Sequence, residues 1–244
     1  MKTLKKKSFS ITRIIMAEFL MLVVVLGFLF IDTMNKNIEE AQNYVTDLTN
    51  KQPNLNYTSE YGIITKTGVA SDDLRLADNF VEGMPQNVQD YVLSHDIAII
   101  IVPDYESLDS LSNEYGTKNS NDFRANDSNV HVTGITQPHF NKPVIHIYAD
   151  EIGSSFIHEL GHAIDYTVNG NQFMKQSNSI SFNKIYKEEK NDWVPLCENV
   201  GGYDASTVEE YFAESFQQYI LYPEYLQENA PLTYEYMEQF VTTL

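Results

Sequence analysis

Apolar residues recur along the chain at helical and strand spacings, and these spacings predict an ordered series of elements. Residues 74–80 and 88–93 carry helical spacing, and Pro85 stands where the second of these helices would begin. Residues 97–102 form a continuous apolar run that ends at Pro103, which indicates a buried strand. The first part of the folded region is therefore expected to contain two helices and a buried strand.

Two more strands are predicted at residues 130–135 and 144–148, with residues 137–143 as the turn or loop between them. Side chains alternate in the second of these strands, which favours a hairpin at the edge of a sheet. Residues 107–115 are a candidate short helix, and the Asn- and Ser-rich residues 116–128 are expected to form a loop.

The segment after the hairpin predicts a helix with a continuous apolar side. Ser154 and Ser155 are suitable N-cap residues, and Asn169 and Gly170 stand just past a suitable C-terminus. Gly161 lies inside this helix, where glycine costs about 1 kcal/mol relative to alanine. A glycine there is useful if a neighbouring element approaches the helix backbone closely.

The last part of the chain is expected to be mostly helical. Residues 171–200 are predicted to be irregular or partly helical, and two helices are expected at residues 207–221 and 231–242. Together with the earlier strands, this order of elements predicts an α+β fold.

The chain begins with a basic segment and a long apolar run, which is the layout of an export signal. Residues 14–31 are apolar except for Glu18, and five basic residues precede them: Lys2, Lys5, Lys6, Lys7 and Arg13. The run ends without the small residues of a cleavage site, which favours an uncleaved anchor. We assign residues 1–31 to a signal peptide or N-terminal membrane anchor, residues 32–70 to a polar stalk or linker, and residues 71–244 to one folded domain.

Charge and cysteine content narrow the classes of partner. The chain carries 34 acidic and 16 basic residues, a formal net charge of −18. Such an acidic surface repels nucleic acid and anionic lipid headgroups, so no nucleic-acid partner is expected. The single cysteine, Cys197, excludes an intramolecular disulfide, so the fold must depend on its core and on a metal.

Residues 158–162 read His-Glu-Leu-Gly-His, a sequence that indicates metal chemistry. On a helix, His158 and His162 lie one turn apart on the same face, where both imidazoles can bind one metal ion. Glu159 stands beside them, placed to take a proton from a metal-bound water. The sequence therefore predicts part of a catalytic zinc site.

A catalytic zinc site usually has three protein ligands and one open position, so a third ligand is needed. One class of site takes it from a histidine after the motif, but Asp165 and Val168 occupy the Gly and His positions of that pattern. The other common solution is a glutamate on a later helix. Glu210 and Glu214 share one predicted helical face, where one can bind the metal and the other can orient a ligand histidine. Their spacing alone leaves the two roles open.

The two motifs together resemble those of a known family. HELGHAID at residues 158–165 and EYFAESF at residues 210–216 are similar to the gluzincin metallopeptidases of the anthrax lethal factor type, which include the secreted Pro-Pro endopeptidases of clostridia. The family pattern places a tyrosine seven residues before the second motif, and Tyr203 stands there. The resemblance implies a zincin-like metallopeptidase domain, with a small mixed sheet, an edge strand over an active-site helix, and a mostly helical C-terminal part.

The resemblance also implies a role for each site residue. The implied ligands of one Zn²⁺ are His158, His162 and Glu210. Glu159 would be the general base, Tyr203 would donate its phenolic hydrogen to the developing oxyanion, and Glu214 would support a ligand histidine. In zincins an edge strand before the metal helix holds the substrate backbone by β-addition, which would place residues 130–148 beside the cleft.

These expectations describe an exported zinc-dependent endopeptidase. It would be a monomer, secreted or anchored to the outer face of the cytoplasmic membrane, and would hydrolyse extracellular or cell-surface proteins through a Glu-activated, zinc-bound water. The alternative is a non-catalytic zinc- or protein-binding surface module of the same fold, but such a module has no use for the base Glu159. A wall-peptide hydrolase ranks lower, since its usual zinc signatures differ. The cleavage-site preference, Pro-Pro included, stays open.

Overall fold

The computed structural model describes much of the chain after residue 58. The described residues are 59, 61–95, 97–105, 108, 132–138, 143–170, 173–190 and 207–244. Residues 50–244 form one compact unit. The predicted N-terminal segment, the predicted loop 116–128 and all of the predicted helix 107–115 except Leu108 lie outside the described residues.

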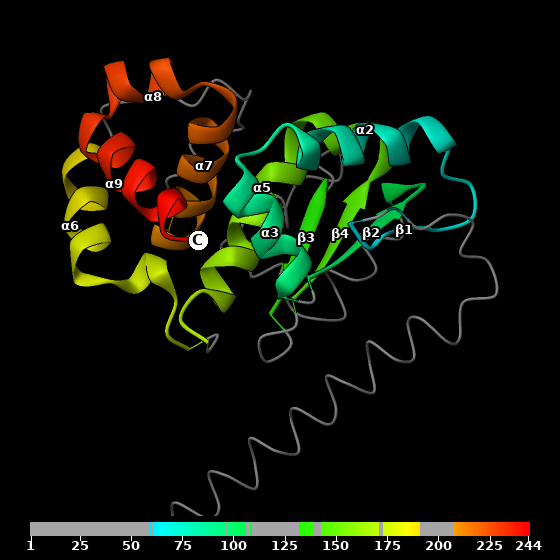
Figure 1. The fold of residues 1–244 in the computed structure, drawn as a ribbon, viewed down its shortest axis with the longest axis horizontal. Coiled ribbons are helices and arrows are strands. Elements are labelled where there is room, and N and C mark those ends of the chain that lie inside the picture. The colour runs from blue at the N-terminus through cyan, green and yellow to red at the C-terminus, as the bar shows by residue number, and fades with distance from the viewer. Residues whose placement is uncertain are drawn as a thin grey trace, which may run out of the picture. The chain divides into compact units, whose positions relative to one another are not determined.

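Helices and strands follow one another largely as the apolar spacing predicts (Figure 1). The elements are β1 (Ile63–Thr65), α2 (Ser71–Glu82), α3 (Gln86–Ser94), β2 (Ala98–Val102), β3 (Gly134–Gln137), β4 (Val144–Tyr148), the 3₁₀ turn η3 (Ala149–Glu151), α5 (Ile152–Thr167), the 3₁₀ turn η4 (Gln176–Asn178), α6 (Ile180–Glu189), α7 (Val208–Leu221), α8 (Pro223–Asn229) and α9 (Pro231–Thr242). Among the strands and α-helices, β1 and α8 are absent from the sequence prediction. Since β1 lies within residues 32–70, the sheet already begins in the segment predicted as a stalk.

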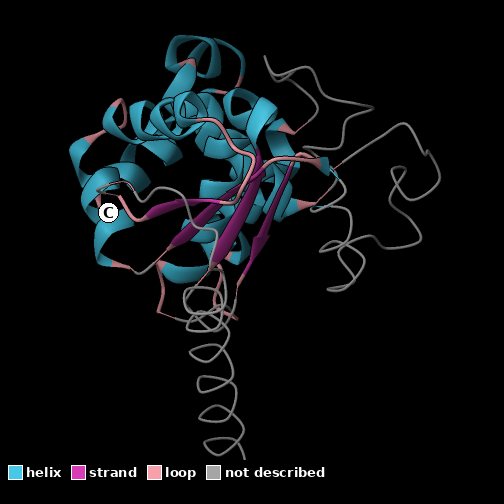
Figure 2. Cartoon of the chain, turned by 90° about the vertical axis from the view of Figure 1, so that its right-hand side faces the viewer, coloured by secondary structure: helices cyan, strands magenta, loops and turns pink. Residues whose placement is uncertain are grey.

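The four strands form one mixed sheet (Figure 2). Their order is β1-β2-β4-β3. β1, β2 and β4 run parallel, with Ile99 beside Ile145, while β3 pairs with β4 in the antiparallel sense. The predicted hairpin is therefore at the edge of the sheet. Within it β3 is the outer strand, and β4, which directly precedes α5, is internal.

β3 begins later than the apolar pattern predicts. Pairing with β4 starts at Thr133, whose carbonyl oxygen accepts the N–H of Tyr148 at 3.1 Å, and continues to Gln137, opposite Val144. The predicted range 130–135 follows the alternation of this segment alone, whereas the register with β4 decides which residues join the sheet.

α5 begins earlier than predicted, because the turn η3 leads directly into it at Ile152. Ser154 and Ser155 therefore lie in its first turn and are not N-caps. The hydroxyl of Ser154 lies 3.1 Å from the carbonyl oxygen of Glu151, and that of Ser155 donates to Oγ1 of Thr133 at 2.7 Å. Gly170 follows the helix with a φ of 68°, the left-handed conformation expected of a residue just past a C-terminus.

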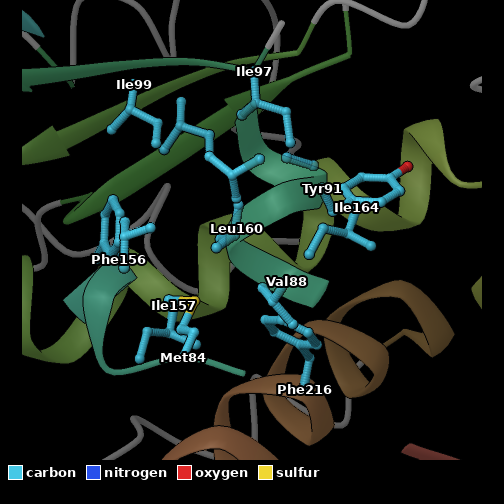
Figure 3. Close-up of a cluster of buried hydrophobic side chains, with 14 of the residues drawn as sticks. Met84, Val88, Tyr91, Ile97, Ile99, Phe156, Ile157, Leu160, Ile164 and Phe216 are labelled. Carbon is cyan, nitrogen blue, oxygen red and sulfur yellow. The ribbon is translucent and has the colours of Figure 1, made fainter. Parts of the chain in front are cut away.

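The main core lies between the sheet and the helices α3 and α5. The fully buried isoleucines of β2 and β4 are Ile99, Ile101, Ile145 and Ile147. They belong to one cluster with Phe156 and Leu160 of α5, Tyr91 of α3 and Phe216 of α7 (Figure 3). α5 therefore lies between the sheet and the C-terminal helices (Figure 1). One side of α5 packs on the sheet and the other on the C-terminal helices, which explains its wide apolar face.

The C-terminal helices pack around aromatic side chains. The ring centroid of Phe182 in α6 lies 5.1 Å from that of Phe212 in α7 and 4.9 Å from that of Tyr236 in α9. The buried carboxylate of Glu189 accepts the backbone N–H and the hydroxyl hydrogen of Thr233, each at 2.8 Å, at the start of α9. These contacts give α7 a rigid support behind the face that it turns to α5. Among the described residues, no helix is both long and apolar enough to cross a membrane.

Gly161 lies where α5 packs on α7. A Cβ atom added to it would lie 3.0 Å from Cα and 3.1 Å from the carbonyl oxygen of Ala213. Both distances are shorter than ordinary van der Waals contact between such atoms. The structure thus confirms the close approach that a glycine inside this helix indicates.

We expect Gly161→Ala to destabilise the protein. The gain in helix propensity, about 1 kcal/mol, is outweighed by overpacking against the Ala213 backbone, which costs about 1–3 kcal/mol. Gly153→Ala is the matched control, because Gly153 is exposed in the same helix and its added Cβ would meet no atom within 4 Å. Thermal unfolding should show a lower midpoint for Gly161→Ala and an unchanged or higher one for Gly153→Ala. Equal midpoints would contradict the close-approach argument.

Candidate metal centre

Two helices bring three metal-binding side chains together. α5 carries His158 and His162, and α7 carries Glu210 in its first turn. Oε2 of Glu210 lies 3.3 Å from Nε2 of His158 and 3.4 Å from Nε2 of His162. One ligand atom from each residue lies within 4.8 Å of the other two. The three residues that the motifs single out as zinc ligands thus meet at one point.

The donor atoms of this cluster and the distances of Glu210 from both imidazoles fit a tetrahedral zinc ion. With bonds of about 2.0–2.1 Å, two ligand atoms of a tetrahedron lie about 3.3 Å apart, which is the separation of Glu210 from each imidazole. Two imidazole nitrogens and one carboxylate oxygen are also a donor set of catalytic zinc sites, where a fourth position stays open. The side chains of the cluster are between 9% and 18% exposed, so the site can be reached from solvent.

Three residues of α7 fix the orientation of His158. Oε2 of Glu214 accepts the Nδ1 hydrogen of His158 at 3.3 Å, which leaves the lone pair of Nε2 for a metal. Gln218 donates from Nε2 to the other carboxylate oxygen of Glu214 at 2.7 Å. Oε1 of Gln217 accepts the backbone N–H of His158 at 2.9 Å. The ring and the backbone of His158 are therefore both held from the neighbouring helix.

The start of α7 places Glu210. Thr207 is the N-cap, and its Oγ1 accepts the backbone N–H of Glu210 at 3.2 Å. A carboxylate in the first turn of a helix lies near the positive end of the helix dipole, which favours its ionised form. The cap thus sets the position of the proposed ligand, and the helix dipole favours its negative charge.

Opposite charges stabilise one another in this cluster. Burial lowers the pKa of His158, but the hydrogen bonds to Glu210 and Glu214 outweigh it and raise the pKa well above its usual range. Burial raises the pKa of Glu210, but the rings of His162 and His158 outweigh it and hold that pKa well below its usual range. A metal ion must displace the proton that the imidazole of His158 carries, so the affinity for metal falls as the pH falls.

Glu159, the residue next to His158, lies against the edge strand β3. Its side chain is 9% exposed. Oγ1 of Thr136 lies 2.7 Å from Oε2 and 2.8 Å from the backbone carbonyl oxygen of Glu159. A Cβ atom added to Gly134 would lie 2.6 Å from Cγ of Glu159. The expected base thus occupies space that only a glycine on the strand leaves open.

A tyrosine and an ion pair flank the cluster. The ring of Tyr166 stacks beside that of His162, with centroids 6.2 Å apart and planes at 19°. Nζ of Lys175 lies 4.9 Å from the centroid of the Tyr166 ring and 3.4 Å from Oε1 of Glu209. Burial and the neighbouring carboxylates raise the pKa of Tyr166, so its hydroxyl keeps its hydrogen at neutral pH.

Asp165 has a structural role that the motifs do not indicate. It is fully buried, and its two oxygens accept the backbone N–H and the hydroxyl hydrogen of Ser177, each at 2.7 Å. Burial raises the pKa of Asp165, although these two hydrogen bonds act in the opposite direction. The contacts hold η4 against α5, beside the metal-binding residues.

Tyr203, the expected oxyanion donor, lies outside the described residues, as do Cys197 and two of the other histidines, His131 and His139. His95 is an exposed residue at the C-terminus of α3, and its Nδ1 lies 3.0 Å from the carbonyl oxygen of Tyr91. His146 is buried in β4.

Sequence reasoning missed several residues that touch the expected site residues, among them Gly134, Thr136, Gln217 and Gln218. The two glutamines stand three and four residues after Glu214, a spacing that places them on its face of the helix and that could have identified them. The two residues of β3 carry no such signal, because their contact with Glu159 depends on the position of a strand relative to a helix.

Comparisons with known proteins identify the family and the fold. Residues 81–240 match the family described as anthrax toxin lethal factor, N- and C-terminal domain. No curated protein matches the chain in sequence. Among solved structures, the chain is similar to the Pro-Pro endopeptidase from Paenibacillus alvei, with 18% sequence identity and a TM-score of 0.53, over 73% of this chain and 96% of that one. At this identity the likeness shows the fold, and it confirms the zincin-like α+β fold class predicted from the sequence.

Proposed function

The chain belongs to the anthrax toxin lethal factor family, and on this premise we propose that it is a zinc-dependent endopeptidase. The observation that carries the proposal is a ligand cluster with a carboxylate beside it. The cluster consists of His158, His162 and Glu210, whose ligand atoms lie within 4.8 Å of one another. The next residue along α5 from the first ligand is Glu159. A non-catalytic metal-binding module of the same fold would require the cluster but not this carboxylate.

Each residue of the site has one task in peptide hydrolysis. The residues that would hold the zinc ion are His158, His162 and Glu210. When bound, zinc supplies Lewis acidity, which polarises a carbonyl group and lowers the pKa of a water. The carboxylate of Glu159 accepts a proton from the attacking water and delivers it to the nitrogen of the leaving amine. Glu214 accepts the Nδ1 hydrogen of the first ligand and so keeps its Nε2 free to bind.

The outer edge of β3 offers a place for the substrate backbone. Thr133 and Tyr148 form a hydrogen-bonded pair, since the carbonyl of Thr133 accepts the N–H of Tyr148. Hydrogen-bonded and non-hydrogen-bonded pairs alternate along antiparallel strands, so Gly134 and Thr136 stand at non-hydrogen-bonded positions of the β3–β4 pair. Their N–H and C=O groups therefore point away from β4, toward the edge. A peptide that adds to this edge in extended form would lie beside Glu159. This supports a peptide or protein as the substrate.

We assign Tyr203 as the oxyanion donor, since it stands at the family offset from Glu210. Tyr203→Phe is expected to lower kcat by about 10²-fold, because the lost hydrogen bond stabilises charge that develops in the transition state. KM should stay near its wild-type value, since this hydrogen bond contributes little to the binding of the ground-state substrate. Tyr222→Phe, which removes a hydroxyl from an exposed tyrosine, is the control. Steady-state kinetics decide, and a wild-type kcat for Tyr203→Phe would remove this residue from the mechanism.

The place of action follows from the N-terminal segment. The apolar residues 14–31 and the basic residues before them have the layout of an export signal. We therefore place the enzyme outside the cytoplasmic membrane, secreted or anchored to its outer face, where it would act as a monomer on extracellular or cell-surface proteins. Fractionation of expressing cells tests this location: recovery of the protein in the cytoplasm alone would contradict it.

A digest of a library of internally quenched peptides tests the proposed activity. The purified full-length protein is incubated with the library in the presence of zinc and, separately, after treatment with a chelator. Cleavage at internal bonds that stops on chelation is the expected result, and the sites cut reveal the preference, Pro-Pro or other. A digest without any zinc-dependent cleavage would contradict the endopeptidase proposal.

A further inference from the structure

We propose that Thr136 is a positioning residue that holds the carboxylate of Glu159 in place for proton transfer, and that Gly134 provides the space in which this carboxylate lies. The inference rests on the proposed peptidase function and adds two residues of the edge strand to its site. It concerns contacts between β3 and α5, outside the cluster of metal-binding side chains.

The hydroxyl of Thr136 reaches two atoms of the same residue. It lies 2.7 Å from Oε2 and 2.8 Å from the backbone carbonyl oxygen of Glu159. A hydroxyl has one hydrogen to donate, so this hydrogen is shared between the side chain and the main chain of Glu159. Hydrogen bonds to an ionised carboxylate are short and stronger than neutral ones. One threonine therefore restricts where the carboxylate can lie relative to its own helix.

Gly134 forms the second half of the contact. An added Cβ atom would lie 2.6 Å from Cγ, 3.0 Å from Oε1 and 3.1 Å from Cδ of Glu159. Any larger residue at this position would push the carboxylate away from the strand. Gly134 and Thr136 are two residues apart, so their side-chain positions face the same side of the sheet. They act together, one by leaving space and the other by donating a hydrogen bond.

The same two residues present their backbone polar groups to the outer edge of β3, as the register with β4 requires. A peptide paired with this edge would be held by Gly134 and Thr136 on one side, while Thr136 holds Glu159 on the other. The distance between the substrate backbone and the base would then be set by one short segment of strand. Misplacement of a reacting group by about 1 Å can cost about 10²-fold in rate.

A purely structural role for Thr136 is the competing explanation, since its hydroxyl also joins β3 to α5. The chain offers a matched control for this role. Thr133, on the same segment, accepts a hydrogen bond from Ser155 of α5 at 2.7 Å and does not touch Glu159. Thr133→Val and Thr136→Val remove the same group from the same strand–helix contact, but only the second loses contact with Glu159.

The test compares Thr136→Val, Thr136→Ser, Thr133→Val and Gly134→Ala with the wild type. For each full-length protein we would measure the zinc content, the thermal midpoint, and kcat and KM on a peptide that the wild type cleaves. Thr136→Val is expected to lower kcat by about 10–100-fold, with KM within about twofold and zinc retained. Thr136→Ser keeps the hydroxyl and should restore most of kcat, while Thr133→Val should lower only the midpoint.

The inference is overturned if Thr136→Val and Thr133→Val have the same kcat. If Thr136→Val does not fold, Gly134→Ala is the deciding variant. Its added methyl group can be accommodated because the flexible side chain of Glu159 moves aside, while the hydroxyl of Thr136 remains. A lower kcat with normal zinc content supports the proposal, and an unchanged kcat contradicts it. A wild-type protein that cleaves no peptide would instead contradict the proposed function, so the two failures are distinguishable.

Discussion

Glu159→Gln is expected to lower peptide hydrolysis by about 10²–10⁴-fold, the range that a positioned general base contributes. Glutamine has nearly the same shape as glutamate, and its amide oxygen can still accept the hydrogen of Thr136. It cannot take a proton from water. The variant should therefore keep its zinc, its thermal midpoint and its KM, and lose only kcat. Kinetics, metal analysis and thermal unfolding on the same preparation measure these quantities.

Glu235→Gln is the control for this substitution. Glu235 is exposed on α9, so the change removes one negative charge from the acidic chain without touching the site. If Glu159→Gln hydrolyses peptides as fast as Glu235→Gln does, the carboxylate next to the ligand histidine is not the base.

Loss of the metal is the second large effect, and it should distinguish the two glutamates of α7. Oε2 of Glu210 faces Nε2 of both histidines, whereas Glu214 contacts only one of the two histidines, His158, and does so at Nδ1. Glu210→Ala removes a ligand and is expected to abolish zinc retention. Glu214→Ala leaves three ligands and removes a partner that orients one of them, which typically costs about 10–100-fold in affinity. Zinc titrations of the two variants, side by side, measure the difference.

Glu209→Ala serves as the control for these variants. Glu209 precedes the ligand in the same helical turn but pairs with Lys175, 3.4 Å away. This variant is expected to bind zinc as the wild type does. If Glu214→Ala loses the metal and Glu210→Ala retains it, the two roles are the reverse of those proposed.

The cluster of potential metal ligands could be predicted from the sequence because its geometry is local. Two histidines four residues apart share a face of any helix, and the same holds for Glu210 and Glu214. The sequence leaves open which glutamate faces the metal, because that depends on how α7 packs on α5. Gly161 is informative for the same reason: a glycine inside a helix has a cost that only a tertiary contact can justify. In the structure, that contact is the backbone of Ala213.

The contacts of Glu159 with β3 could not be predicted, because they are not local. The alternation of apolar residues predicts the strand at 130–135, where Thr136 would lie beyond its end. Only pairing with β4 moves the strand to Gly134–Gln137, and only the packing of α5 then brings Glu159 onto it. The start of α5 could not be predicted for the same reason. Ser154 and Ser155 have the chemistry of N-caps, but η3 places the beginning of the helix before them.

Hydrolysis measured during a zinc titration of the metal-stripped protein tests the central claim most directly. The account predicts that the stripped wild type cleaves no peptide and that the rate rises with added zinc to a plateau at about one zinc per chain. His158→Ala, titrated in parallel, should show no such rise. Full hydrolysis by the stripped protein, or a normal plateau for His158→Ala, would contradict the claim that His158, His162 and Glu210 bind the zinc that makes this chain a peptidase.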